Sequence, residues 1–223
     1  MTYHPETAAQ RGLPGPRAPN DWLYLHYEPL WRALRRELGA LRGRVLDVGC
    51  GLQPYRSLLG PEVEYVGLDR PGREPKADLE GDAQAIPAPD GSFDAVMSTQ
   101  VLEHVTDPAA ALREAVRVLR PGGRVVLTVP GCWPAHEVPH DFWRFTRHGV
   151  LHLVEAAGLG ELRLEVLGGL WATVGQMFAL ELAHRGRWRR LVPAVNRLAH
   201  YLEQHAPARE ELVMTWLLTA RKP

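Results

Sequence analysis

A short apolar run that ends in two glycines constrains the fold of this chain more than any other feature. Residues 45–48 are apolar except for one aspartate, which is typical of a strand buried on both faces of a parallel sheet. Gly49 and Gly51 then allow a tight turn and a close approach of the backbone to a ligand. Pro54 suits the first turn of a helix, which we expect through residues 55–59. The pattern therefore predicts a central strand with a ligand at its end, and an ordinary strand-to-helix turn is the alternative.

Further strand-like and helical segments alternate along the chain. We expect strands over 64–69, 93–98 and 125–129, a polar segment over 78–83, and helices over 29–41, 107–119 and 146–157. The helix at 29–41 should start at Pro29, and Pro121–Gly123 should end the helix that Asp107 caps. Strands that alternate with helices form right-handed parallel crossovers. The predicted fold is therefore α/β, a doubly wound, Rossmann-like and mostly parallel sheet with its ligand at the carboxyl ends of the strands.

The C-terminal third departs from this alternation. Residues 162–167 and 212–220 look like two late strands, and we expect a late antiparallel strand there. The mostly helical residues between them, about 170–206, are predicted to form an inserted hairpin that serves as a lid or a homodimer surface. Residues 1–20, rich in proline, are predicted to be a flexible arm. We expect residues 21–223 to form a single domain.

Composition excludes several classes of partner. Lys plus Arg and Asp plus Glu balance at 26 each in 223 residues, so net charge gives no reason to expect nucleic acid. No long apolar stretch predicts an integral membrane segment, and no signal-peptide pattern opens the chain. The two cysteines, Cys50 and Cys132, lie in separate loops. These features favour a reducing, cytoplasmic location.

The second strand supports a nucleoside-like ligand. It ends in Asp69, which lies 18 residues after Gly51 and close to the interval at which a carboxylate accepts both ribose hydroxyls. A solvated aspartate at a strand end is the alternative.

Five motifs together resemble a known family. V-L-D-V-G-C-G, Y-V-G-L-D, G-D-A-Q-A-I-P-A-P-D-G-S-F-D-A-V, V-L-E-H-V and L-R-P-G-G-R-V occur in this order over residues 44–130. The chain resembles the class I S-adenosylmethionine-dependent methyltransferases, in particular the bacterial type 11 group. Two later stretches also resemble sequences found in a subgroup of that family: W-x-x-H-E-x-P-H-D-F-W-R-F-T and G-G-L-W-A-T.

The resemblance implies S-adenosylmethionine as the cofactor and assigns residues to it. Asp47, Gly49 and Gly51 should line the methionine and ribose portion, Asp69 the ribose hydroxyls, Asp82 with Ala83 the adenine edge, and Gln100 the methionine side. One position departs from the pattern, because Gln53 stands where the family often has a third glycine. Pro54 also makes a nicotinamide dinucleotide a poorer ligand, since G-x-G-x-x-G would require glycine there.

The stretch His136-Glu137-Val138-Pro139-His140 matches the zinc-protease pattern H-E-x-x-H. That pattern needs both histidines on one helical face, and Pro139 opposes a helix. We therefore predict no metal there. The segment follows the strand at 125–129, where substrates meet the cofactor in this fold. His136 or His140 is a candidate general base, oriented by Asp141 or Glu137, and a loop held by histidine hydrogen bonds is the alternative.

Three further residues are candidates for contact with the acceptor. The Trp143 side chain can stack on a ring of the acceptor, and the Arg144 side chain can pair with an anionic group. His104 follows the strand at 93–98 together with Glu103, and the two either contact substrate or hold that loop.

These features predict a methyltransferase that acts on a small-molecule acceptor. A general base helps attack by oxygen more than attack by nitrogen, so O-methylation is favoured over N- or C-methylation. The alternative is a non-catalytic S-adenosylmethionine-binding or scaffold protein of the same fold.

Overall fold

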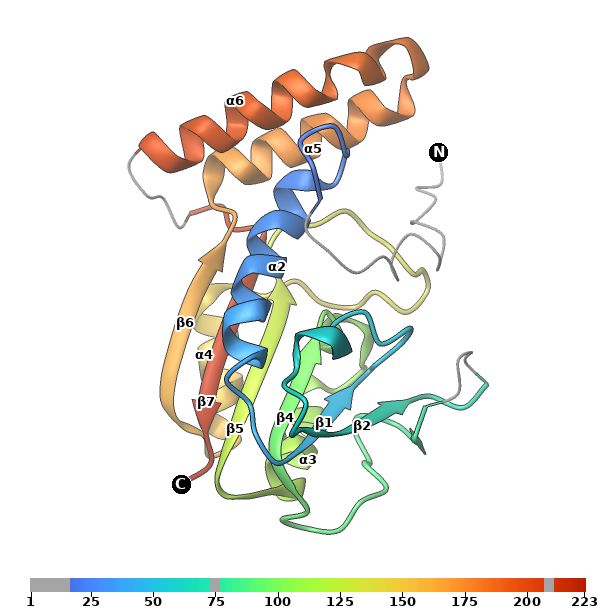
Figure 1. Cartoon of the computed structure of the whole chain (residues 1–223), viewed down its shortest axis with the longest axis vertical. Coiled ribbons are helices and arrows are strands. Elements are labelled where there is room, and N and C mark those ends of the chain that lie inside the picture. Colours follow the sequence, from blue (N-terminus) through green and yellow to red (C-terminus); the bar gives the residue numbers. More distant parts are fainter. Residues whose placement is uncertain (1–16, 73–76, 207–210) are drawn as a thin grey trace.

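The structure is a computed structural model that describes residues 17–72, 77–206 and 211–223. Most of the predicted N-terminal arm, residues 1–16, lies outside the described residues. A sheet of seven strands forms the centre of the molecule, with helices on both faces (Figure 1).

The strands are β1 (Arg44–Val48), β2 (Glu64–Asp69), β3 (Leu79–Glu80), β4 (Phe93–Thr99), β5 (Leu119–Pro130), β6 (Gly160–Leu167) and β7 (Thr215–Arg221). The α-helices are α2 (Tyr24–Leu38), α3 (Pro108–Val118), α4 (Arg147–Ala156), α5 (Leu170–His184) and α6 (Val192–His205). Short 3₁₀ helices occur at η1 (Arg56–Leu58), η2 (Leu102–His104) and η3 (Gly186–Leu191).

The strand order is β3-β2-β1-β4-β5-β7-β6. Strands β1 to β5 pair in parallel, and β7 runs antiparallel between β5 and β6. The chain moves outward from β1 in one direction through β2 and β3, and returns to its other side at β4. Such a reversal opens a crevice at the carboxyl ends of the strands. The predicted doubly wound sheet with a late antiparallel strand is confirmed.

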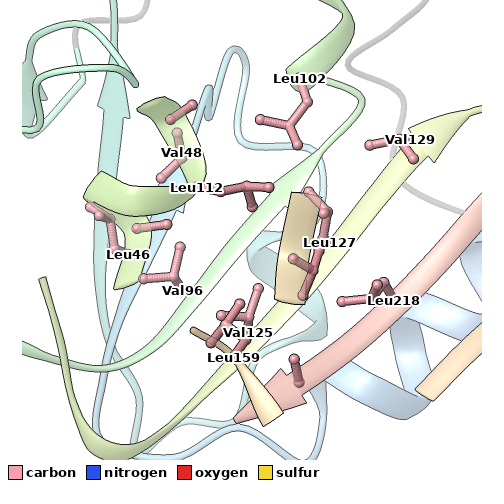
Figure 2. Packing of buried hydrophobic residues seen from close by; sticks show 14 of the residues in the cluster. Leu46, Val48, Val96, Leu102, Leu112, Val125, Leu127, Val129, Leu159 and Leu218 are labelled. Carbon is pink, nitrogen blue, oxygen red and sulfur yellow. The ribbon is translucent and has the colours of Figure 1, made fainter. Parts of the chain in front are cut away.

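Alternate residues of each strand pack on opposite faces of the sheet. Val45 packs with α2 residues such as Leu34, whereas Leu46 packs with α3 and α4 residues such as Leu112 and Val150. Figure 2 shows part of the second cluster, in which side chains from β1, β4, β5 and β7 meet. Each fully buried leucine contributes about 1.5–3 kcal/mol relative to exposure. The two clusters hold the strand ends, and hence the crevice, in place.

Two predicted helices differ from the structure. The helix expected over 55–59 is only the 3₁₀ turn η1, because the break at Gly60-Pro61 leaves too short a segment for a stable α-helix. Helix α2 begins at Tyr24 rather than at Pro29, which lies inside it. Tyr24 and Leu25 are buried against the α5–α6 hairpin, and this packing outweighs the backbone bond that proline lacks.

Helix α3 also ends earlier than predicted, at Val118, and β5 begins at Leu119, so Pro121–Gly123 lie within the strand. The predicted cap at Asp107 is confirmed, and Thr146 caps the start of α4 in the same way. The Asp107 side chain accepts a hydrogen bond from the Ala110 N–H, and the Thr146 hydroxyl accepts one from the Gly149 N–H.

Helices α5 and α6 pack on each other at one end of the molecule, beside the start of α2 (Figure 1). Gly175 allows their close approach, because a Cβ there would lie 2.4 Å from the Cβ of Ala199. The Gln176 side chain ties α5 to α2: its Oε1 accepts from the His26 N–H, and its Nε2 donates to the Trp22 carbonyl. Among the described residues, no helix is long and apolar enough to cross a membrane.

Candidate functional site

The carboxyl ends of β1, β2 and β4 open into a cavity of about 440 Å³. This volume lies in the range of small-molecule sites. Every residue that the sequence analysis assigned to the cofactor lines the cavity: Asp47, Gly49, Gly51, Asp69, Asp82, Ala83 and Gln100.

The turn after β1 depends on left-handed backbone conformations. Gly49 has φ +72°, and a Cβ there would lie 2.5 Å from a Val101 methyl carbon. Gln53 also has a positive φ, +55°, which a glycine adopts without strain and a glutamine does not. This is the position where the family often has its third glycine, so the departure in sequence leaves the backbone conformation in place.

Asp47 is the most buried acid of the cofactor group. It is 4% exposed, and its Oδ2 accepts a 2.7 Å hydrogen bond from the Tyr65 hydroxyl on β2. Burial raises the pKa of Asp47 to about 7, although the bond from Tyr65 opposes this rise. A carboxyl so placed gains by facing a positively charged group such as a sulfonium or an ammonium.

Asp69 and Asp82 hold the two neighbouring loops. Asp69 Oδ2 accepts from the Gly51 N–H at 2.9 Å, which joins the end of β2 to the glycine turn. Asp82 Oδ1 accepts from both the backbone and the side-chain nitrogens of Gln84, at 2.8 and 3.0 Å. Carboxylates retain further lone pairs when they accept such bonds, so both residues are suited to bind hydroxyl and amino groups as well.

Gln100 follows β4 with φ +57°. Its N–H donates to the Thr128 carbonyl at 3.0 Å, and its Nε2 donates to the Thr128 hydroxyl at 3.2 Å. These two bonds to β5 fix the side chain at the cavity, between the cofactor residues and the segment that follows β5.

The opposite wall of the cavity comes from the segment after β5. His136 and His140 line it together with His104 of η2. No helix forms over residues 131–146, so the shared helical face that a zinc-protease motif needs is absent there, as Pro139 predicted. The Phe142 N–H donates to the Glu103 carbonyl, and Trp143 Nε1 donates to the Val105 carbonyl, both within 3 Å. These bonds hold the segment against the loop after β4.

Arg144 holds the segment after β5 together through hydrogen bonds to other residues of that segment. Its guanidinium makes a bidentate pair with Asp141 at 2.7 and 2.8 Å and also donates to the carbonyls of Trp133 and Pro134. Burial alone would raise the pKa of Asp141, but the bonds from Arg144 and from the His136 N–H lower it to about 2. Trp143 and Arg144 do not line the cavity, so the structure places neither of these two predicted substrate ligands at its wall.

His104 and His136 lie side by side, with ring centroids 4.8 Å apart. His104 Nδ1 lies 2.7 Å from the His140 carbonyl oxygen, and His136 Nδ1 lies 3.2 Å from the Pro134 carbonyl and 3.3 Å from Asp141. A carbonyl oxygen only accepts hydrogen bonds, so these contacts favour the proton on Nδ1 in each ring, and at His136 they are shorter than the 3.5 Å from Nδ1 to the Arg144 guanidinium. Asp141 lies close enough to the His136 ring to orient it, and it also accepts a hydrogen bond from the His136 N–H at 2.9 Å.

Helix α2 supplies lining residues that the sequence analysis did not assign. His26, Tyr27 and Leu30 line the cavity, and the His26 ring lies 4.5 Å from that of Trp133. Burial, and then the charge of His136, lowers the pKa of His26 to about 3, so the ring is neutral. The aromatic residues Trp22, Tyr24, Tyr27 and Trp31 are the sequence signal in this segment, and they fit packing against the domain as well as a place at a pocket mouth. None of the lining residues belongs to α5 or α6, so the predicted lid does not cover the cavity.

A doubly wound sheet with a glycine turn and acids at successive strand ends defines a Rossmann-like protein that binds a nucleoside cofactor. Residues 46–127 match the type 11 family, which is described as a methyltransferase domain. Residues 46–127 therefore form a methyltransferase domain of the type 11 group, and S-adenosylmethionine is accordingly the cofactor of this domain.

Several known proteins are similar over part of the chain. The demethylmenaquinone methyltransferase of Beutenbergia cavernae is 38% identical over 140 residues, which cover 56% of this chain and 58% of the relative. The malonyl-(acyl-carrier protein) O-methyltransferase of Dechloromonas aromatica is 34% identical over 164 residues, which cover 69% and 61%. The crystal structure of the 4+2 cyclase SpnF has the same fold, with a TM-score of 0.58 and 24% identity over 88% of this chain and 81% of that one. The chain spans between 36% and 61% of the length of these and similar curated relatives.

Proposed function

We propose that this protein transfers the methyl group of S-adenosylmethionine to a hydroxyl-bearing small molecule. The observation that carries the proposal is that one cavity is lined both by the acids at the strand ends and, on another wall, by His104, His136 and His140. The first set suits a nucleoside with a charged amino-acid tail. The second suits an acceptor whose attacking atom must lose a proton.

On the cofactor side, each acid has a distinct task in the proposal. Asp69 accepts the ribose hydroxyls, and Asp82 with the Ala83 backbone accepts the adenine amino group. Asp47 and the glycine turn face the methionine and ribose portion, where the burial of Asp47 strengthens its attraction to positive charge. Gln100, held by Thr128, contacts the methionine side.

On the acceptor side, the bound cofactor supplies an electrophilic methyl group, and the chain positions the nucleophile. We assign His140 as the general base that takes the proton of the acceptor hydroxyl. His104 and His136 line the same wall beside it. Positioning of two reactants supplies much of the rate enhancement in such a site.

Titratable histidines at the cavity wall support attack by oxygen, because a hydroxyl needs deprotonation more than an amine does. The relatives act on different atoms: one is named an O-methyltransferase, and others are named C-methyltransferases of ubiquinone and menaquinone biosynthesis. Carbon attack is therefore the nearest alternative within the same reaction class.

The rival from another class is a protein that binds S-adenosylmethionine without methyl transfer. The SpnF structure is named a cyclase, so this fold also serves other functions. A candidate general base at the cavity wall, His140, favours turnover.

The test incubates the purified chain with S-adenosylmethionine carrying a labelled methyl group and a panel of phenols, enols, carboxylic acids and amines. We expect label in an oxygen-bearing product and a cofactor affinity in the low micromolar range, about 8 kcal/mol. Tight cofactor binding without label in any acceptor would favour the binding protein, and label only on carbon or nitrogen would remove the preference for oxygen.

We also propose that the α5–α6 hairpin forms a homodimer surface. Large apolar side chains are exposed on it, among them Phe178 at 53% and Leu198 at 60%. Light scattering should give twice the chain mass for the wild type and one chain mass for the double variant Phe178→Ser, Leu198→Ser. A monomeric wild type would remove this proposal.

We also propose a cytoplasmic location, which the two free cysteines support.

A further inference from the structure

Glu103 is a buried carboxyl group that the proposed chemistry does not use. It is 0% exposed, and neither of its side-chain oxygens has a hydrogen-bond partner among the described residues. Burial raises its pKa to about 8. A buried polar group without a partner costs about 1–3 kcal/mol, and more when it is charged. Such a group is therefore expected to have a ligand or a role in function.

Two histidines converge on Glu103 from different segments. His104 Nε2 lies 3.8 Å from Glu103 Oε1, and His136 adds a third donor from the segment after β5. One potential ligand atom from each of the three residues lies within 4.8 Å of the other two. Glutamate oxygen and histidine nitrogen are the donors that zinc and ferrous sites combine.

The surroundings of the histidines match those of metal ligands. Histidines that bind metals typically donate their other ring N–H to a backbone carbonyl or a carboxylate, which fixes the tautomer. His104 Nδ1 does so with the His140 carbonyl at 2.7 Å, and His136 Nδ1 with the Pro134 carbonyl at 3.2 Å and with Asp141 at 3.3 Å. In both rings the basic lone pair is therefore on Nε2. Asp141 is itself held by Arg144, so this support is rigid.

We propose that Glu103, His104 and His136 bind a divalent transition-metal ion at the wall of the cavity. Ligand atoms about 2.1 Å from a tetrahedral zinc ion lie about 3.4 Å apart, so the 3.8 Å between Glu103 and His104 closes by a few tenths of an ångström on binding. His104 and His136 line the cavity, which leaves the remaining coordination position toward the acceptor. Three protein ligands and one open position are the usual arrangement of a catalytic zinc site.

This site is not the H-E-x-x-H pattern that the sequence analysis rejected. It uses His136 but not His140, and it takes Glu103 and His104 from the loop after β4, more than thirty residues earlier in the chain. Two segments distant in the sequence form it, so motif spacing did not indicate it.

The role of the ion rests on the proposed function. A cation at the wall attracts an acceptor oxygen and lowers the pKa of its hydroxyl, which is what O-methylation requires. The preferred acceptor would therefore present an ionisable hydroxyl. His140, outside the ligand set, then takes the released proton.

The experiment measures binding of Co²⁺ and Zn²⁺ to the full chain after removal of metal with a chelator. Visible absorption of the Co²⁺ form reports ligand number, and calorimetry gives the affinity. We expect one ion per chain. Glu103→Gln and His136→Asn should each weaken binding by more than the roughly 10- to 100-fold that changes around metal ligands cost. His140→Asn, a histidine on the same wall that is not a ligand, should bind within about threefold of the wild type, and its backbone carbonyl still supports His104.

Affinity for S-adenosylhomocysteine, measured on every variant, reports that the fold is intact. If Glu103→Gln fails to fold, His104→Asn decides in its place. A wild type that binds neither ion, or ligand variants that bind as the wild type does, would overturn the metal site. Methyl transfer without metal binding would contradict the metal site and leave the proposed function standing. Metal binding without methyl transfer to any acceptor would instead count against the proposed function.

Discussion

The two walls of the cavity are built in different ways. The cofactor wall consists of strand ends: Asp47 is the second-to-last residue of β1 and Asp69 is the last residue of β2, at fixed places in the parallel sheet. The acceptor wall consists of irregular chain after β5, helix α2 and the 3₁₀ turn η2. It is held by the Arg144–Asp141 pair and by bonds such as that from Trp143 to Val105, 38 residues away. The first wall follows from strand order, and the second follows from side-chain contacts. The two walls should therefore respond separately to mutation.

The largest expected effect is on the acceptor wall. His140→Ala should lower turnover by about 100-fold or more, because it removes the proposed general base, while cofactor affinity hardly changes. His152→Ala, an exposed histidine on α4, is the matched control and should leave turnover unchanged. Single-turnover rates and calorimetry measure the two quantities. Intact turnover in His140→Ala would remove that assignment.

The next effect is on the cofactor wall. Asp69→Ala should weaken binding of S-adenosylmethionine and S-adenosylhomocysteine by roughly 30-fold, about 2 kcal/mol, because it removes the acceptor of the ribose hydroxyls. The control is Asp94→Asn on β4, which accepts a bond from Arg44 at the amino ends of the strands, far from the cavity. It should change stability and leave affinity alone. Unchanged affinity in Asp69→Ala would contradict the proposed role.

The cofactor wall could be predicted from the sequence more fully than the acceptor wall. The pattern of strands placed Asp47 and Asp69 at one edge of the sheet, because parallel strands bring their carboxyl ends together, whereas Asp82 was assigned from the family resemblance; all three line the cavity. It did not place Trp143 and Arg144, whose polar groups face the protein rather than the cavity. It also left Glu103 undecided between substrate contact and loop support. Of the two histidines near Glu103, His136 comes from a segment that only the folded chain brings near.

The contribution of the cofactor wall to stability should also depend on pH. The pKa of Asp47 is raised from 3.8 to about 7, so the folded state holds a proton that the unfolded state has lost between these values. The free energy of unfolding should therefore fall as pH rises from about 4 to about 7, by up to about 1.4 kcal/mol per pH unit from this group.

Tyr65→Phe tests this account, because the Tyr65 hydroxyl stabilises the ionised carboxylate. Its cost should be about 1.5 kcal/mol at pH 8 and less at pH 5, where Asp47 is protonated. Chemical denaturation at the two values measures the difference. An equal cost at both would show that Asp47 does not ionise across this range.

The smallest expected effect concerns the contacts of the acceptor wall. Trp143→Phe keeps a ring but removes the donor to the Val105 carbonyl, so it should lower stability by about 1 kcal/mol. Turnover should fall modestly, and cofactor affinity should stay constant. A variant as stable as the wild type that instead shows a raised KM for the acceptor would return Trp143 to the role of a substrate ligand.

A crystal structure with S-adenosylhomocysteine and an acceptor bound tests the division of the cavity most directly. Our account predicts the ribose hydroxyls on Asp69, the adenine beside Asp82, and the sulfur directed toward an acceptor that lies between it and His140. A cofactor bound elsewhere, or a sulfur directed away from the segment after β5, would contradict it.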